Sequence, residues 1–289
     1  MGMINKMFSA FLPIFLLGLW PAPQTARAET AVIASLPVPP PVEPLLIPEH
    51  LSASGVLVVD ATSGQPLYAT QSTYRRPIAS LTKLMTALLI VENHSLDEIV
   101  TIPEAVNGIN GTQIQLQPGD QFTVGEMLSA ILIPSANDAA IALAHHHSGS
   151  VDEFVKAMNE RADKLGLRNT RFDDPVGMDS PDQYSTPKDI VWLFRYVLDE
   201  PEIASRLGQA GARITSNNGV DITLSHTHDM LHGANTPIVA GKTGTSPAAG
   251  ECLISLVQSG GRDYVVVFLN SSSRYEDMRA VLRALHIPS

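Results

Sequence analysis

The sequence has 289 residues, 44% of them hydrophobic and 17% charged, which is enough to bury the core of one large domain or two small ones and excludes a mostly disordered chain. Acidic residues outnumber basic ones by 29 to 19, and the formal net charge of -10 argues against nucleic acids and anionic membrane surfaces as partners. The single cysteine, Cys252, excludes an internal disulfide, and no spacing of cysteine and histidine is typical of a zinc site.

The first 28 residues have the order of a secretory signal peptide. Lys6 precedes an apolar run, 7–20, and the Ala-Arg-Ala sequence at 26–28 supplies a cleavage site. The run contains Pro13 and is shorter than the ~20 residues that a membrane-spanning helix needs. We therefore expect cleavage after Ala28, a periplasmic or cell-wall location, and no integral membrane span in the mature protein. Retention of the run as a membrane anchor is the alternative.

A proline-rich segment follows the predicted signal. Six prolines fall between positions 37 and 48, a density that favours an extended polyproline spacer. We predict a linker at 29–49 and a folded domain at 50–289.

Strand signals lie at both ends of this domain. Residues 55–60 and 66–69, joined by a turn at 62–64, predict a β-hairpin. Three β-rich runs near the C-terminus, at 237–245, 251–258 and 263–270, predict an antiparallel meander.

The pattern between the strands is helical. Apolar residues at helical spacing predict helices at 81–92, 124–133, 138–147, 151–165 and 187–198, and a final amphipathic helix at 275–286. We expect an α+β fold in which an antiparallel sheet formed from both chain ends packs on a central helical insertion, with a cleft between sheet and helices.

Ser80 and Lys83 are a candidate nucleophile and base. They lie three residues apart at an expected helix start, so hydroxyl and amine share one face of the helix, one turn apart. The pattern is weak alone, because about one Ser-x-x-Lys occurs by chance in a chain of this length. The second copy, Ser185 to Lys188, has Pro187 at a first helical position, so we interpret it as a helix start.

Ser135 and Asn137 follow Pro134 in a break between two expected helices, where they would point into the cleft. An ordinary turn with Asp138 as helix cap is the alternative. The same Ser-x-Asn pattern recurs at 216–218, so this motif is also weak by itself.

Lys242, Thr243 and Gly244 form a rarer motif on an expected strand. Alternation places Lys242 and Gly244 on one face, where the glycine would leave room for a ligand. The three motifs carry weight together, because each falls on the element that the chemistry needs.

The set resembles the active-site serine penicillin-binding proteins and β-lactamases, and most closely the low-molecular-mass D-alanyl-D-alanine carboxypeptidases. The resemblance covers residues 52–286 and includes the stretches 76–86, 169–172, 184–186 and 249–253. Two differences stand out. Thr245-Ser246 replaces a common aromatic or histidine followed by threonine, and His226-Thr-His228 stands where Asn-Thr-Asn is common. Both bear on substrate preference rather than reaction type.

The resemblance implies a β-lactamase-like fold and acyl transfer without a cofactor. Ser80 would attack the bond between two D-alanines of a peptidoglycan stem peptide, with Lys83 as base and Ser135 as a relay to the leaving amine. β-Lactam antibiotics would act as covalent inhibitors. The residues implied in substrate binding are Asn137, Lys242, Thr243, Gly244 and Thr245, and the backbone amides of Ser80 and Thr245 would form the oxyanion hole.

The proposed base requires an unusual lysine. A free lysine is almost fully protonated at pH 7, so the pKa of Lys83 must be lowered by ~3 units for it to serve well. Burial against the helix and the positive charge of Lys242 across the cleft both act in that direction.

Four other groups have simpler interpretations. The consecutive histidines 145–147 splay ~100° apart on a helix and cannot converge on one metal ion. His226, His228 and His232 lack a carboxylate-rich partner pattern. Cys252 is expected to be a small buried hydrophobic residue, and Asp173-Asp174 is expected to cap a loop. We expect no metal and no cofactor.

Three other functions remain open. A DD-endopeptidase that cuts peptidoglycan crosslinks would use the same chemistry, and the chain ends soon after its last expected helix, as in the shorter endopeptidase branch. A serine β-lactamase must hydrolyse its acyl-enzyme quickly, but the Glu-x-x-Leu-Asn stretch of class A enzymes is missing between 137 and 242. The complete set of site residues argues against a catalytically idle wall-binding module.

Overall fold

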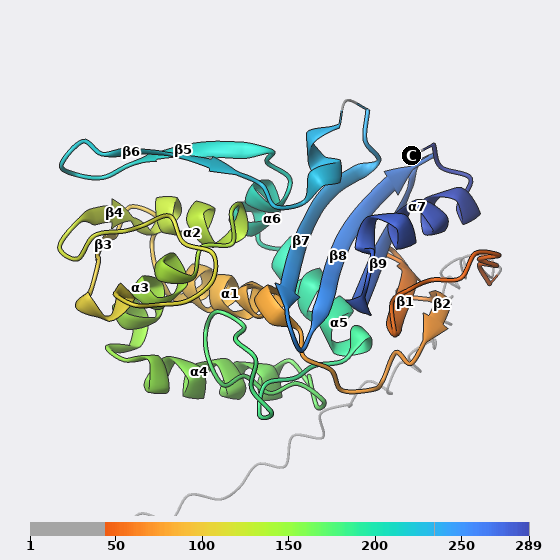
Figure 1. Ribbon diagram of the computed structural model, residues 1–289, viewed down its shortest axis with the longest axis horizontal. Coiled ribbons are helices and arrows are strands. Elements are labelled where there is room, and N and C mark those ends of the chain that lie inside the picture. Colours follow the sequence, from red (N-terminus) through yellow and green to blue (C-terminus); the bar gives the residue numbers. More distant parts are fainter. Residues whose placement is uncertain (1–43, 234, 289) are drawn as a thin grey trace, which may run out of the picture. The chain divides into compact units, whose positions relative to one another are not determined.

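The structure is a computed structural model that describes residues 44–233 and 235–288. The predicted signal peptide and most of the predicted linker lie outside these residues. The central feature is a five-stranded antiparallel sheet in the order β2-β1-β9-β8-β7 (Figure 1). Its strands are β1 Gly55–Asp60, β2 Pro66–Thr70, β7 Ile238–Ser246, β8 Gly250–Ser259 and β9 Arg262–Ser271.

The sheet joins the two ends of the domain, as the sequence predicted. β1 pairs with β9 along its whole length, with Val58 opposite Val266. The N-terminal hairpin and the C-terminal meander are both confirmed to within two residues. The predicted α+β fold, with a sheet assembled from both chain ends, is therefore confirmed.

Seven helices accompany the sheet within the described residues. Six of them were predicted, and their bounds differ from the prediction by at most two residues. The helices are α1 Lys83–Asn93, α2 Val124–Leu132, α3 Asn137–Ser148, α4 Val151–Lys164, α5 Pro187–Leu198, α6 Pro201–Leu207 and α7 Arg274–Ala284.

The sequence missed α6 and two small hairpins. The hairpins are β3 Ile99–Thr101 with β4 Gln121–Thr123, and β5 Gly211–Thr215 with β6 Asp221–Ser225. Each strand of the two small hairpins buries only one residue, so no hydrophobic period marks it, and tertiary contacts decide its structure.

Alternation along β9 divides the core into two layers. Val265, Val267 and Leu269 face one cluster together with buried residues of α1 and α5. Val266 and Phe268 face a second cluster that α7 closes on the other side of the sheet (Figure 1). Helix α1 is buried along its first eight residues, so its N-terminus lies inside the domain beside the sheet.

The last residues of the predicted linker pack on the domain. The amide of Leu45 donates to the carbonyl of Leu67 at 2.8 Å, and Leu45 and Ile47 contact the cluster under α7. The folded unit therefore begins before the predicted boundary at residue 50. No helix of the described residues is long and apolar enough to cross a bilayer.

Candidate active site

Ser80 lies in a short 3-10 turn, Ala79–Thr82, directly before α1. The predicted helix start is thus correct in position, but the first turn is tighter than an α-helix. Ala79 has φ of 46°, a left-handed conformation that costs a non-glycine residue of order 1 kcal/mol. Such strain persists only where neighbouring segments hold the chain, and here they aim the Ser80 side chain at a cavity.

The amine of Lys83 contacts three groups. Its Nζ lies 3.1 Å from the Ser80 Oγ, 2.7 Å from the Asn137 Oδ1 and 2.7 Å from the carbonyl oxygen of Val176. The side chain is fully buried. One turn of helix therefore brings hydroxyl and amine together, as the three-residue spacing predicted.

Burial lowers the pKa of Lys83 from 10.5 to about 7. Desolvation is the largest cause, because a charged amine is disfavoured in a low-dielectric interior, while the nearby carboxylates of Asp174 and Asp138 oppose it. The sequence argument also invoked repulsion from Lys242, but burial dominates. A substantial fraction of Lys83 is therefore neutral at pH 7.

Ser135 and Lys242 form a second hydroxyl and amine pair. The Nζ of Lys242 donates to the Ser135 Oγ at 2.8 Å and to the carbonyl oxygen of Thr243 at 3.0 Å. Ser135 has φ of 66° in the break between α2 and α3, which turns its side chain toward the sheet. Burial lowers the pKa of Lys242 well below its ordinary value, and the positive charges of Lys83 and Arg274 lower it further.

Asn137 connects the pair at Ser80 to a loop. Its Oδ1 accepts from Lys83, and its Nδ2 donates to the carbonyl oxygen of Asn110 at 2.7 Å. The alternative in which Asp138 caps the helix is wrong. Ala136 occupies the N-cap position without a side-chain bond, and the Asp138 carboxylate instead accepts the backbone amides of Ile114 and Leu116, each at 3.1 Å.

Strand β7 lies against the Ser80 turn. A Cβ added to Gly244 would come within 2.9 Å of the Ile78 carbonyl oxygen and 3.0 Å of the Ser80 amide nitrogen. The sequence argument assigned this space to a ligand, but the structure gives it to the Ser80 turn. The Thr227 Oγ1 lies 2.5 Å from the Thr243 Oγ1 and so positions Thr243. The Thr245 Oγ1 accepts a hydrogen bond from the Arg274 guanidinium at 2.6 Å.

A cavity of about 400 Å³ opens over Ser80. Asn137 and Thr245 also line it, together with the loop 176–179. Asp174 shapes this loop, because its carboxylate accepts the amides of Val176 and Met178 at 2.6 and 2.9 Å. The prediction that Asp173-Asp174 caps a loop is confirmed. All eight predicted site residues therefore belong to this cavity or to the elements that enclose it.

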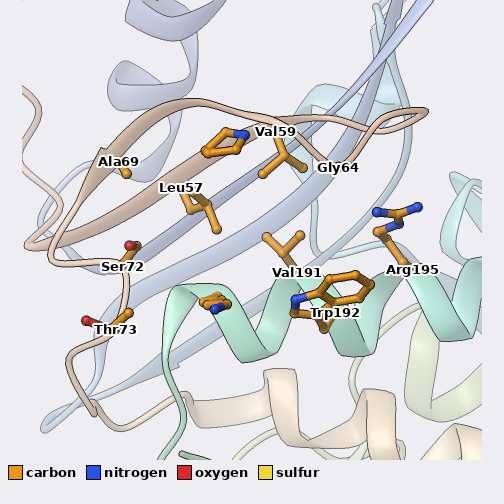
Figure 2. A pocket seen from close by; sticks show the side chains of 11 residues that line it. Leu57, Val59, Gly64, Ala69, Ser72, Thr73, Val191, Trp192 and Arg195 are labelled. Carbon is orange, nitrogen blue, oxygen red and sulfur yellow. The ribbon is translucent and has the colours of Figure 1, made fainter. Parts of the chain in front are cut away.

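Another cavity, of about 380 Å³, lies between the β1–β2 hairpin and α5 (Figure 2). Leu57, Val59, Val191 and Trp192 make much of its wall apolar, and the Arg195 guanidinium stands 5.2 Å from the centre of the Trp192 ring. None of the predicted site residues borders it. The chemistry therefore belongs to the cavity over Ser80.

Ser185 and Cys252 have the structural roles that the sequence suggested. Ser185 lies outside α5, which begins at Pro187 with Thr186 as N-cap, and its Oγ contacts the Thr170 hydroxyl at 2.8 Å. Cys252 is fully buried in β8, and burial raises the pKa of its thiol to about 11. Burial also lowers the pKa of His226 and His228 to about 3, so both are neutral at pH 7.

The sequence missed the roles of Val176 and Asp138 in orienting the site. Val176 acts through its backbone carbonyl, and Asp138 holds a loop, 114–116, that lies on another segment. Asp174, which precedes Pro175, was predicted to cap a loop, because an Asp-Pro pair is typical of a turn.

Comparison with known proteins agrees with this geometry. The model of the D-alanyl-D-alanine carboxypeptidase family matches residues 43–273, which include every site residue. The chain belongs to this family. Among its relatives, the D-alanyl-D-alanine carboxypeptidase DacF of Bacillus subtilis is 34% identical over 82% of this chain. The match covers 61% of DacF, so the chain spans less than two thirds of that relative.

Family members with other names are also similar. The D-alanyl-D-alanine endopeptidase of Pseudomonas aeruginosa is 31% identical over 85% of this chain and 79% of its own length. Among solved structures, the DD-transpeptidase of Streptomyces K15 superposes with a TM-score of 0.76 at 28% identity, over 82% of this chain and 97% of the other. A D-alanyl-D-alanine carboxypeptidase of Mycobacterium tuberculosis gives 0.76 at 29% identity, over 84% and 94%.

Proposed function

We propose that the chain is an extracytoplasmic serine D-Ala-D-Ala carboxypeptidase that acts on peptidoglycan stem peptides and is acylated by β-lactams. The observation that carries the proposal is the contact between the Ser80 hydroxyl and a buried Lys83 whose pKa is about 7. A nucleophile beside a base of matched pKa is the arrangement that acyl transfer by serine needs.

The contacts of Lys83 define which proton moves. In its neutral form the amine has two N–H bonds and one lone pair. Asn137 Oδ1 and the Val176 carbonyl accept the two N–H bonds at 2.7 Å each, which leaves the lone pair for the Ser80 hydroxyl. Lys83 then takes the Ser80 proton as the Oγ bonds to the substrate carbonyl carbon.

The departure of D-alanine involves the second hydroxyl and amine pair, Ser135 and Lys242. The bond to the leaving D-alanine breaks as its nitrogen takes the hydroxyl proton of Ser135, and Ser135 takes a proton in turn from protonated Lys242, whose Nζ lies 2.8 Å from the Ser135 Oγ. Water then hydrolyses the ester on Ser80 and releases the shortened peptide. Lys242 and Thr243 would bind the terminal carboxylate, whose negative charge favours the protonated form of Lys242.

Trapping the acyl-enzyme tests this proposal. Intact-mass spectra after treatment with benzylpenicillin should show one adduct per chain, absent in Ser80→Ala and retained in the matched control Ser185→Ala. An adduct that persists in Ser80→Ala contradicts the assignment. Nitrocefin turnover at tens per second, a rate typical of efficient enzymes, would favour the β-lactamase alternative.

The endopeptidase remains the second candidate, because two curated endopeptidases are 31% and 29% identical over 79% of their own lengths. The two activities differ in the bulk carried beyond the cleaved bond. Purified muropeptide monomers and crosslinked dimers, digested side by side, separate them. The carboxypeptidase proposal expects free D-alanine from the monomers at the higher rate.

The extracytoplasmic location rests on the signal pattern at 1–28, followed by a proline-rich spacer that starts at residue 29 and ends before Leu45. Fractionation of cells that express the full chain tests it. A mature N-terminus at residue 29 in the periplasmic or wall fraction is expected, and the uncleaved chain in the detergent phase would show a retained anchor.

A further inference from the structure

The C-terminal ends of α1 and α3 bring two histidines and a glutamate together. His94 is the C-cap residue of α1, directly after Asn93, His146 lies in the last turn of α3, and Glu98 is in the connection between α1 and β3. The Glu98 Oε2 lies 2.8 Å from the His94 Nδ1 and 3.3 Å from the His146 Nε2. One ligand atom from each residue falls within 4.8 Å of the other two.

We propose that His94, Glu98 and His146 bind a divalent transition-metal ion such as Zn²⁺. Metal bonds of ~2.0 to 2.2 Å in a tetrahedral site place ligand atoms about 3.3 to 3.6 Å apart, so small side-chain rotations would bring all three to one ion. Two imidazoles and one carboxylate suit zinc, cobalt and nickel better than the oxygen-loving Mg²⁺. The Glu98 side chain is 41% exposed, which leaves the fourth position to water.

Two further features favour a cation at this point. The His94 Nε2 lies 2.9 Å from the His147 Nδ1. The His147 ring can therefore accept a hydrogen bond from the His94 Nε2–H, which leaves the His94 Nδ1 free to bind the metal. The last carbonyl groups of α1 and α3 also carry partial negative charge toward this end of the helix pair.

The consecutive histidines alone could not reveal this site. On one helix the three rings diverge, and only His146 of the three is a ligand. The other two ligands come from a different helix end and its following turn, which only the packing of α1 against α3 brings near (Figure 1).

The ion would act structurally rather than in the chemistry. Helix α1 has 11 residues and is about 16 Å long, and Lys83 lies at its opposite end. The metal would clamp the far ends of the two helices that begin with Lys83 and Asn137. We therefore expect it to raise thermal stability and to leave the acylation rate of Ser80 unchanged.

Calorimetric titration of the EDTA-dialysed full chain with ZnCl₂ at pH 7.5 tests the proposal. We expect one equivalent of Zn²⁺ to bind and no binding of Mg²⁺. The affinity should fall at least tenfold in His146→Ala and in Glu98→Gln, and it should stay unchanged in the matched control His145→Ala. The Zn²⁺ affinity of His147→Ala should be about tenfold lower than that of the wild type, as is typical when a residue that orients a metal ligand is removed.

Penicillin acylation of each variant checks that the variant is folded. If His146→Ala does not fold, Glu98→Gln still tests the metal site. Two results would overturn the proposal. The first is no Zn²⁺ binding by the wild-type chain up to 1 mM, and the second is equal affinity in the wild type and Glu98→Gln.

Discussion

Lys83 is the residue on which the proposed chemistry depends, through its side-chain amine. Three oxygen atoms surround a buried nitrogen, and one of them belongs to the proposed nucleophile, Ser80. Since desolvation is the largest cause of its low pKa, the same burial that excludes water also makes the amine a base. Short-range sequence pattern could place Lys83 beside Ser80, but it could not show how deeply it is buried.

The first prediction is a pH profile governed by Lys83. A pKa of about 7 means that the amine is charged, and inactive as a base, below this pH. The kcat/KM for D-alanine release should therefore rise through pH 7 and fall about tenfold for each pH unit below 6. The rate of acylation by benzylpenicillin, measured over pH 5 to 9, should show the same rise through pH 7. A flat profile from pH 6 to 8 contradicts a base of this pKa.

The second prediction concerns Lys242. If it binds the terminal carboxylate, Lys242→Ala should weaken cleavage of peptides with a free D-alanine end by ~2 to 4 kcal/mol. Amidation of that end should cause the same loss, and the two changes should not add, because both remove one interaction. Rates on both peptides with both enzymes measure this. Equal losses of rate on the free and amidated peptides would contradict carboxylate binding. They would show instead that Lys242 acts by setting the protonation state of neighbouring groups.

Packing between elements explains both the successes and the gaps of the sequence analysis. The strands of the large sheet and helices such as α5 were predicted because 5 to 14 residues repeat one hydrophobic period. The loop contacts of Asp138 have no period, since they join its carboxylate to the backbone of another segment. The space beside Gly244 was assigned wrongly for the same reason, because a strand pattern does not reveal what lies against it.

The third prediction tests this contact between β7 and the Ser80 turn. In Gly244→Ala the new Cβ would meet two backbone atoms at 2.9 and 3.0 Å, and backbone cannot rotate away. We expect a loss of ~1 to 3 kcal/mol in the free energy of unfolding and a slower acylation of Ser80. Urea unfolding and stopped-flow acylation measure the two effects.

Gly233 provides the control for this change. It has an ordinary φ of -76°, and the nearest atom to an added Cβ is 3.6 Å away. Gly233→Ala should therefore leave both measurements close to the wild type. Normal acylation by Gly244→Ala would show that β7 can shift without disturbing the nucleophile.

At the scale of the molecule, a sheet built from both chain ends needs a connection between them. Asp277 of α7 provides it, because its buried carboxylate accepts the Ser52 amide at 2.7 Å, the Ala53 amide at 3.0 Å and the Ser271 hydroxyl at 2.7 Å. One side chain thereby fixes the segment that enters β1 and the residue that ends β9 on the same helix.

The fourth prediction is that Asp277→Ala destabilises the whole domain. The substitution leaves two backbone amides without their acceptor in a buried place, and bonds to charged groups contribute ~1.5 to 3 kcal/mol each. We expect a loss of about 3 kcal/mol or more in urea unfolding. The neighbouring Glu276→Ala is the matched control, since the Glu276 carboxylate forms an exposed ion pair with Arg279 and its loss should change stability by less than ~1 kcal/mol. Equal effects of the two substitutions would show that Asp277 does not hold the chain ends together, because a general change in the charge of α7 would then account for both.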